Sequence, residues 1–458
     1  MHPVRKLWCR IYQTAFRIAL PVLPYREPKP LKTFGEAADL LVRKKIARVL
    51  IVTDRNITQL GLARELEQDL TERGVAYTIF DEVVPNPTIS NVEAARERYL
   101  ADGCGAIIAF GGGSAMDCAK VTGARIVRPK KPVTKMRGIL RVLRPLPLLI
   151  AVPTTAGTGS ETTLAAVITD DKTHYKYPIN DFCLIPHYAV LDYRTTLGLP
   201  AHITATTGMD ALVHATEAYI GRSTTRETRE RAIEAVSLIR SYLLRAYRDG
   251  SDAEARAQML HAAYCAGIAF TKSYVGYVHA VAHSLGGQYG IAHGLANAVL
   301  LPYFLDEYGE ACEKRLAELA RRSGVAAADA EDAEAARTFI TWTRDMNEQM
   351  GIPTTLPGIR NEDIPAMAAH ADAEGNPLYP VPRLMDAHEL ERMYHVVQDP
   401  ADADGDAEGT HETVGETVAA AAPAAPGIVA RMKRAVRAAG RRARRAARRA
   451  RTTIRHNR

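Results

Sequence analysis

The order of short apolar runs and helical stretches constrains this 458-residue chain more than any other feature. From Lys45 to about Asp192, apolar runs alternate with stretches of helical periodicity, as in a parallel sheet covered by helices. The predicted strands are Arg48–Val52, Tyr77–Phe80, Ala106–Phe110, Leu148–Val152 and Ala189–Leu191. The first part of the chain is therefore predicted to be an α/β domain.

After about Thr196 the β-type runs disappear, and apolar residues recur at spacings of three and four. This periodicity predicts the helices Ala205–Ile220, Thr228–Tyr247, Ala253–Ser273 and Tyr277–Gln288. We expect an N-terminal arm and α/β domain over residues 1–196, an all-helical domain over 197–398 and a separate tail over 399–458.

The tail carries most of the charge asymmetry of the chain. Residues 431–458 contain 13 Lys or Arg and no acid, whereas residues 399–416 contain 7 acids and no Lys or Arg. The formal charge of +7 therefore belongs to the tail, and the body is nearly neutral. We expect no nucleic-acid partner for the body and a disordered tail with too little apolar surface to fold. Binding of the Arg/Ala segment to an anionic surface stays an alternative.

Cysteine usage and the first residues indicate a cytoplasmic protein. The six cysteines are scattered without a Cys-x-x-Cys pair, which fits a reducing compartment. Arg10 and Arg17 interrupt the apolar residues of the N-terminus, so no signal peptide or membrane span is predicted. The first residues are expected to form an arm that lies on the body.

A glycine-rich segment follows the strand predicted at Ala106–Phe110. Its sequence from Gly111 to Lys120 is GGGSAMDCAK. Glycines at a strand–helix turn let the backbone approach a ligand, and the free N–H groups of the next helix favour a phosphate. The segment is not the Gly-x-Gly-x-x-Gly fingerprint, so an ordinary tight turn stays the alternative to a diphosphate site.

Two further segments are predicted to lie at the same edge of the sheet. Residues Pro153 to Thr163 read PTTAGTGSETT and combine hydroxyl groups with glycines after another predicted strand. Asp54 follows the first strand, where a carboxylate can accept hydrogen bonds from an adenosine ribose and repel a 2′-phosphate. The alternative for Asp54 is a helix cap.

Histidines and one aspartate gather in the helical half. Asp210 and His214 are four residues apart and share a helix face, while His279, His283 and His293 lie within fifteen residues. A single histidine on an apolar face is usually a packed core residue. Four histidines with an aspartate in helices that could face one crevice favour a first-row metal site instead.

These motifs together resemble those of the iron-containing (group III) alcohol dehydrogenases. The segments GGGSAMDCAK, PTTAGTGSETT, GMDALVHATEAY and HAVAHSLGGQYGIAHGLANAVLLP are similar to that family's motifs in order and spacing, and the similarity covers roughly residues 31–395. The resemblance implies a Rossmann-like nucleotide domain, a helical metal-binding domain, as in the dehydroquinate synthase-like fold, and a homo-oligomer. The N-terminal arm looks longer than is usual, and the tail has no counterpart known to us.

The resemblance also implies roles for single residues. It makes Asp210, His214, His279 and His293 the metal ligands and His283 an additional active-site histidine. The positions implied to contact NAD are Asp54, Asn86, Gly112, Gly113, Ser114, Asp117, Thr154, Thr155, Thr158, Thr163 and Lys176. Iron(II) is the metal implied, and zinc stays open because imidazole suits both ions.

The expected function is hydride transfer between a small alcohol, aldehyde or ketone and NAD. We expect the bound metal to lower the pKa of the alcohol hydroxyl, and His283 either to relay the proton or to serve in packing. An enzyme of the glycerol dehydrogenase or dehydroquinate synthase type is the first alternative, although its ligand set normally lacks one Asp with three His. A tail-mediated nucleic-acid or membrane association of a retained dehydrogenase body is the second.

Overall fold

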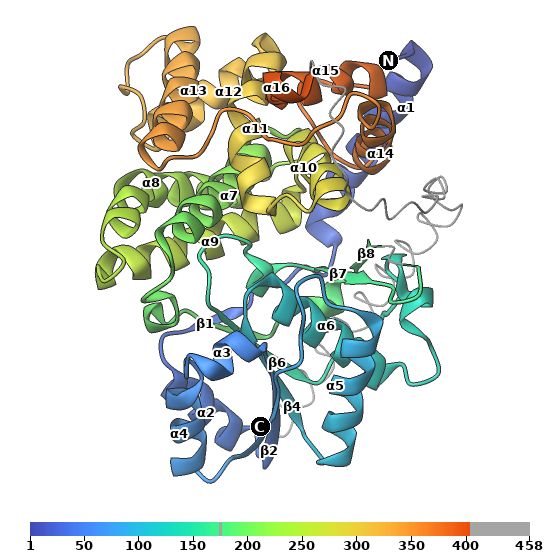
Figure 1. Ribbon diagram of the computed structural model, residues 1–458, viewed down its shortest axis with the longest axis vertical. Coiled ribbons are helices and arrows are strands. Elements are labelled where there is room, and N and C mark those ends of the chain that lie inside the picture. The colour runs from blue at the N-terminus through green and yellow to red at the C-terminus, as the bar shows by residue number, and fades with distance from the viewer. Residues whose placement is uncertain (174–175, 404–458) are drawn as a thin grey trace, which may run out of the picture.

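The computed structural model describes residues 1–173 and 176–403 and divides into an α/β half and a helical half (Figure 1). Its main sheet is parallel throughout, in the order β1-β9-β6-β4-β2-β3. The strands are β1 (Lys29–Leu31), β2 (Arg48–Val52), β3 (Ala76–Phe80), β4 (Ala106–Gly111), β6 (Leu148–Pro153) and β9 (Tyr188–Val190). The predicted α/β fold with a parallel sheet is confirmed.

Helices cover both faces of this sheet because its strands are apolar on both sides. Residues of β2 and β4 are almost wholly buried, and their side chains enter two separate apolar clusters. The helices of this half are α2 (Phe34–Arg43), α3 (Arg55–Gln59), α4 (Arg64–Glu72), α5 (Ile89–Ala101) and α6 (Gly113–Val127). Figure 1 shows α2 and α4 on one side of the sheet and α5 and α6 on the other.

A small second sheet was not predicted. It has the order β5-β8-β7 and consists of β5 (Gly138–Ile139), β8 (Lys176–Asn180) and β7 (Ala165–Thr169). Its strands are short, and Pro178 lies within β8, where proline weakens the sequence signal of a strand. The three-residue strand β1 was missed for the same reasons, because it contains Pro30.

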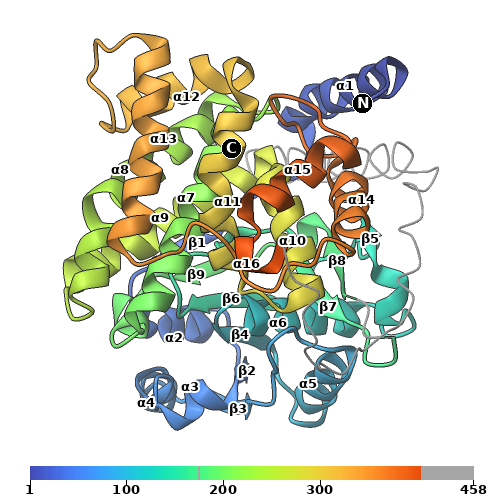
Figure 2. The same ribbon diagram turned by 45° about the horizontal axis from the view of Figure 1, so that its top comes forward.

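The helical half begins after β9 and confirms the predicted change from mixed to all-helical structure. Its helices are α7 (Ala201–Ile220), α8 (Arg226–Arg248), α9 (Ala253–Ser273), α10 (Tyr277–Tyr289), α11 (His293–Tyr308), α12 (Glu310–Arg322), α13 (Asp332–Gln349), α14 (Ile364–Gly375), α15 (Ala387–Val397) and α16 (Pro400–Ala403). Short 3-10 turns lie at Leu20–Val22, Val133–Met136, Ser160–Thr162, Phe182–Leu184 and Tyr193–Thr196. Figure 2 shows α7, α9, α10 and α11 gathered in the middle of this half.

Both ends of the described chain are helical. The arm forms α1 (Pro3–Ala19), which lies on the helical half. The first tail residues form α16, where Asp402 accepts a hydrogen bond from the backbone N–H of Gly358 at 2.6 Å. The predicted disorder of the rest of the tail concerns residues outside those described, and the bounds at 196 and 398 stay predictions.

No described helix is long and apolar enough to cross a membrane.

His187, at the entrance to β9, makes the stability of the sheet sensitive to acid. Its Nδ1 accepts a hydrogen bond from the backbone N–H of Leu149 at 3.1 Å, which requires a neutral ring. Burial, helped by the nearby Arg26 charge, lowers the pKa of His187 to about 4. The unfolded chain takes up this proton near pH ~6.5, so the stabilisation is complete above that pH and is lost as the pH falls toward 4.

We therefore expect His187→Asn to flatten the pH dependence of stability. Asparagine Oδ1 can replace Nδ1 as an acceptor but does not titrate, so the variant should lose about 1–3 kcal/mol less than the wild type between pH ~6.5 and ~4. Chemical denaturation across this pH range measures the difference. His202→Gln is the control, and equal slopes for wild type and His187→Asn would contradict the prediction.

Candidate metal centre and nucleotide loops

Helix α7 carries two of the predicted metal ligands on its inner face. Asp210 and His214 are one turn apart and only 1% and 4% exposed. The neighbouring residues Ala211, Leu212 and Val213 are wholly buried, so apolar packing on all sides holds this part of the helix in place. The His214 ring stacks on Phe270 of α9 with the ring centroids 4.1 Å apart, which fixes its orientation.

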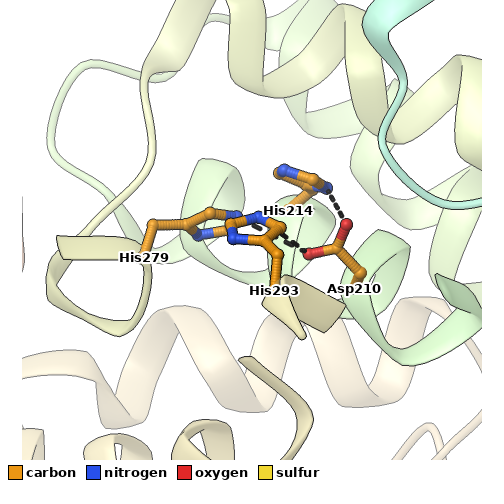
Figure 3. Close-up of side chains that lie close together, drawn as sticks. All are labelled: Asp210, His214, His279 and His293. Carbon is orange, nitrogen blue, oxygen red and sulfur yellow. Dashed lines mark ion pairs between the residues drawn. The ribbon is translucent and has the colours of Figure 1, made fainter. Parts of the chain in front are cut away.

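The other two predicted ligands come from either side of a chain break. His279 lies in the first turn of α10, and His293 is the first residue of α11. Gly290 ends α10 with φ +69°, a left-handed conformation that glycine adopts without strain, and this turn directs His293 back toward α7. Figure 3 shows the side chains of Asp210, His214, His279 and His293 converging on one point, and their ligand atoms all lie within 4.8 Å of one another.

Two further side chains fix the orientation of this cluster. Glu217 of α7 accepts hydrogen bonds from His279 Nδ1 at 2.7 Å and from the backbone N–H groups of Gly276 and Val278. The His279 Nε2 atom is thereby left facing Asp210, at 3.9 Å from Oδ1. Asn297 of α11 donates through Nδ2 to Asp210 Oδ1 at 2.7 Å and lies 3.0 Å from His293 Nε2.

The three imidazoles of the cluster favour their neutral form. Burial lowers the pKa of His214 and that of His279, and it lowers the pKa of His293 to about 4 against the opposing charge of Asp210. A neutral imidazole keeps the lone pair that binds a metal ion. The cluster thus offers three nitrogen donors and one carboxylate at neutral pH.

Two nitrogen atoms of the cluster lack a hydrogen-bond partner, and this shows whether the four residues suit a cation. His214 Nδ1 and His279 Nε2 are buried without a hydrogen-bond partner. Such a polar atom costs about 1–3 kcal/mol when it stays unpaired, and a cation among the four residues would satisfy both. The other metal-like group of the described residues, Glu234 with His261 and Cys265, differs because His261 Nε2 is already bonded to Glu234 at 2.9 Å. The cluster around Asp210 is therefore the one that fits a metal.

His283 stands beside the cluster but faces a carboxylate. Its Nδ1 lies 2.7 Å from Glu374 Oε1, which also accepts a hydrogen bond from the Tyr379 hydroxyl. Its ring stacks on His293 with centroids 5.1 Å apart, and its side chain is 43% exposed. Partial desolvation lowers the pKa of His283, but the charge and hydrogen bond of Glu374 outweigh that effect and raise it. His283 is thus set apart from the four converging residues.

The two predicted nucleotide loops lie side by side at the carboxyl edge of the parallel sheet. β4 leads into Gly112 and Gly113, where α6 begins, with Ser114 in its first turn, and β4 pairs directly with β6. A Cβ atom on Gly112 would lie 3.8 Å from Thr155 Oγ1, and one on Gly113 would lie 3.7 Å from Thr158 Cγ2. The backbone of Thr154 donates to Gly111 O at 3.2 Å. The first loop and Thr154, Thr155 and Thr158 therefore form one surface.

The second loop also packs on the helical half. A methyl group on Gly157 would lie 2.6 Å from Thr207 of α7, and one on Gly159 would lie 2.8 Å from Gly267 of α9. Such contacts are too close for any side chain, so glycine is required at both positions. Thr207 is one turn before Asp210, and this packing therefore places the nucleotide loops next to the metal cluster.

Asp117 and Thr163 belong to the support of the second loop. Asp117 accepts hydrogen bonds from Ser160 Oγ at 3.2 Å and from the backbone of Val167 at 2.9 Å. The buried ammonium of Lys120 donates to Thr163 Oγ1 at 2.8 Å and to Ser160 Oγ at 3.0 Å. Burial lowers the pKa of Lys120 to about 8. These contacts tie α6 to the second loop, so the two residues stabilise the loop whether or not they contact a nucleotide.

Asp54 adopts the capping role that the sequence left as its alternative. Its Oδ1 accepts hydrogen bonds from the backbone N–H groups of Asn56 and Ile57 at the start of α3. Its Oδ2 lies 3.8 Å from the position of a Cβ on Gly111, so the carboxylate also borders the first nucleotide loop. The cap and a ribose contact are therefore compatible.

Asn86 and Lys176, the remaining predicted nucleotide positions, meet each other. Lys176 Nζ donates to Asn86 Oδ1 at 2.8 Å. The Lys176 charge is one of the smaller effects that lower the pKa of His293, after burial. The structure therefore brings Asn86 and Lys176 into direct contact with each other.

The residues that sequence reasoning missed are those that orient the ligands. Asn297 follows His293 by four residues, so helical spacing could have placed it beside that ligand. Glu217 orients His279 of another helix, so no local spacing indicates its role. Glu374 lies 91 residues beyond His283, and no local pattern links the two. The stacking of Phe270 on His214 likewise depends on how α7 and α9 pack.

Comparisons with known proteins point to one protein family for both halves of the chain. A family model described as iron-containing alcohol dehydrogenase matches residues 31–193, and one described as the C-terminal part of the Fe-containing alcohol dehydrogenase family matches residues 204–397. The chain is 36% identical to 1,3-propanediol dehydrogenase of Citrobacter freundii, over 83% of this chain and 98% of that protein. It is also 36% identical to NAD-dependent methanol dehydrogenase of Bacillus methanolicus, over 71% and 85%.

A solved structure extends the similarity to the whole fold. The alcohol dehydrogenase from Oenococcus oeni matches with a TM-score of 0.77 and 34% sequence identity, covering 81% of this chain and 100% of that one.

Substitution of single histidines should separate ligands from neighbours. We expect His279→Ala or His293→Ala to weaken metal binding by at least about 100-fold, since loss of an outer hydrogen-bond partner alone costs about 10–100-fold. His283→Ala should keep the metal, because His283 is bonded to Glu374 instead. Metal content after equilibrium dialysis measures both effects, with His261→Ala as the matched control. Full metal content in either ligand variant would refute the assignment, and so would loss of metal in His283→Ala.

Proposed function

This chain belongs to the iron-containing alcohol dehydrogenase family, and we propose a chemistry for its site on that basis. It is an oxidoreductase, an NAD-linked alcohol dehydrogenase whose substrates are small alcohols or the matching carbonyl compounds. The family implies a nicotinamide cofactor and iron or a similar metal. The observation that carries the proposal is the convergence of four ligand atoms within 4.8 Å beside the two glycine-containing loops.

Asp210, His214, His279 and His293 are the residues that we propose hold the metal. When bound, a divalent metal lowers the pKa of an alcohol hydroxyl and the nicotinamide accepts a hydride. Glu217 holds the His279 ring so that Nε2 faces Asp210. Phe270 covers one face of the His214 ring and keeps water from it. The ligands therefore need little rearrangement to bind an ion.

Proton transfer is assigned to His283. Its Nδ1 is held by Glu374, whose Oε1 is fixed in turn by the Tyr379 hydroxyl. The side chains of His283 and Glu374 are 43% and 35% exposed, so a proton released beside the cluster can pass from the imidazole to solvent. His283 thus borders the cluster on one side and solvent on the other.

The nucleotide is assigned to the loops at the carboxyl edge of the sheet. Gly112, Gly113 and Ser114 offer backbone N–H groups at the start of α6 to the diphosphate. The residues proposed to line the rest of the nucleotide are Asp54, Asn86, Asp117, Thr154, Thr155, Thr158, Thr163 and Lys176. Iron(II) rather than zinc, a homo-oligomeric state and a cytoplasmic location complete the proposal and rest on the family resemblance and the sequence.

Turnover with defined metals tests the proposed function. The full chain is stripped of metal with a chelator and then reloaded with iron(II) or zinc, and NADH oxidation is followed with formaldehyde, propanal, 3-hydroxypropanal and lactaldehyde. We expect activity only after reloading, with at least one of these aldehydes. A folded protein that binds the metal and NADH yet reduces none of them would contradict the proposal, and so would equal activity of the stripped enzyme.

Cofactor choice should depend on the charge of Asp54. Facing the 2′-phosphate of NADP, this carboxylate would add repulsion that is absent for NAD. Asp54→Asn keeps an acceptor for the α3 cap but removes the charge, whereas Asp54→Gly removes both. We expect the wild type to prefer NAD, and both variants to shift the ratio of kcat/KM toward NADP by at least about 10-fold, equivalent to ~1.4 kcal/mol.

Asp249→Asn in the helical half is the control for the change in net charge. Arg55, next to Asp54, can approach a phosphate and limits the size of the preference. An unchanged cofactor ratio in both Asp54 variants would reduce this residue to a helix cap, and a wild type that prefers NADP would place the ribose elsewhere.

A further inference from the structure

The N-terminal helix α1 lies outside the region that the family models match, which begins at residue 31. It covers Pro3–Ala19 and continues into a 3-10 turn at Leu20–Val22. Figures 1 and 2 both show it at the edge of the helical half, beside α14 and α15. Any role of α1 is therefore an addition to the proposed dehydrogenase site.

One face of α1 is fixed firmly to the body. Cys9, Gln13, Phe16 and Leu20 are buried, and Gln13 Nε2 donates to the backbone oxygen of Tyr379 at 2.7 Å. The Arg5 guanidinium forms a two-pronged ion pair with Asp372 of α14, with both distances 2.7 Å. The Arg10 guanidinium donates to the backbone oxygens of Val381 and Pro382, each at 2.8 Å. The orientation of the helix about its own axis is thereby fixed.

The opposite face of α1 is apolar and exposed. Val4, Leu7, Trp8, Ile11 and Ile18 are between 53% and 74% exposed. At 3.6 residues per turn these side chains centre on the side of the helix opposite Cys9, Gln13 and Phe16. They include the most exposed large apolar residue of the described chain, Ile18. A row of such residues on a soluble domain marks an interaction surface, whereas single exposed residues do not.

The positive charge of α1 indicates which kind of partner its apolar face binds. The first acidic residue of the chain is Glu27, while Lys6 and Arg17 are exposed on the helix between its buried and apolar faces. A second copy of this helix would bring like charges together, which opposes association of two such faces. A nucleic acid would leave the apolar side chains without a partner. An anionic lipid surface accommodates both the charged and the apolar side chains of α1, since its headgroups attract the cations and its acyl chains take up the apolar face.

We propose that α1 docks the protein on an anionic lipid surface, lying in the plane of the interface with Leu7, Trp8, Ile11 and Ile18 inserted among the acyl chains. The 13 Lys or Arg of residues 431–458 give the chain a second cationic segment, and membrane attachment is firmer with two signals than with one. The proposal rests on α1 alone, and that segment lies outside the described residues. It is independent of the chemistry proposed for the metal centre.

Trp8 provides a direct probe, because the chain contains only one other tryptophan, Trp342. In the full-length Trp342→Phe variant, emission should shift to shorter wavelength when vesicles containing roughly 30% phosphatidylserine in phosphatidylcholine are added at ~0.1 M salt. Pure phosphatidylcholine vesicles should leave the emission unchanged, and raising the salt to ~0.5 M should weaken the binding. An emission maximum that does not shift when anionic vesicles are added would overturn the proposal.

Vesicle co-sedimentation of a variant with an altered apolar face, the face variant, tests whether the exposed apolar residues of α1 bind the lipid. The triple variant Leu7→Ser, Ile11→Ser and Ile18→Ser alters exposed side chains only, so it should fold with an unchanged alcohol oxidation rate but bind anionic vesicles at least about 10-fold more weakly. The matched control, Val42→Ser, Leu60→Ser and Leu100→Ser, removes three exposed apolar residues elsewhere and should bind like the wild type.

Two results would overturn the proposal. Vesicle binding of the face variant equal to that of the wild type would assign the attachment to another segment, which deletion of residues 431–458 would reveal. The second result combines two observations: the wild type does not bind vesicles, and the face variant dissociates from an oligomer that the wild type forms. The apolar face would then be a contact between copies of the chain.

Discussion

Two imidazole nitrogens, His214 Nδ1 and His279 Nε2, are buried beside the Asp210 carboxylate without a hydrogen-bond partner, and the site depends on what satisfies them. Burial keeps these rings neutral, so neither can form an ordinary ion pair with Asp210. A divalent cation would resolve this conflict, because it would bind both lone pairs and offset the charge of the carboxylate. The buried support of Glu217 and the stacking of Phe270 then appear as the means of presenting nitrogen atoms to an ion.

Helix α7, which carries the proposed ligands Asp210 and His214, also packs against the second of the two predicted nucleotide loops. Gly157 packs against Thr207 of α7, and Gly159 packs against Gly267 of α9, at distances that exclude any side chain. The α/β half therefore meets the helical half one turn from Asp210. With the metal and the nucleotide bound as we propose, this packing would bring them together. It also explains the two glycines of the loop, since a side chain at either position would clash with the helical half.

The sequence predicted those elements well whose bounds are set by neighbouring residues of the chain. The strand Arg48–Val52 and the helix Ala253–Ser273 were predicted with their observed bounds. The strand is a short, continuous apolar run, and the helix starts directly after its capping residue Asp252. It failed for β1 and the small sheet, whose strands are short and contain Pro30 and Pro178.

The sequence motifs and the family resemblance were enough to group the four converging side chains. The residues that surround the cluster could be predicted only in part, since Glu374 reaches His283 through the packing of α14 on α10. Asp54 shows the remaining ambiguity, because one carboxylate both caps α3 and borders the nucleotide loop.

A crystal structure of the iron- or zinc-loaded protein, with anomalous scattering recorded at the metal edge, would show which side chains bind the ion. We expect one ion at about 2.0–2.2 Å from an Asp210 carboxylate oxygen and from one nitrogen of each of His214, His279 and His293. Anomalous density at the Glu234, His261 and Cys265 group alone, or none at Asp210 in a fully loaded protein, would contradict it.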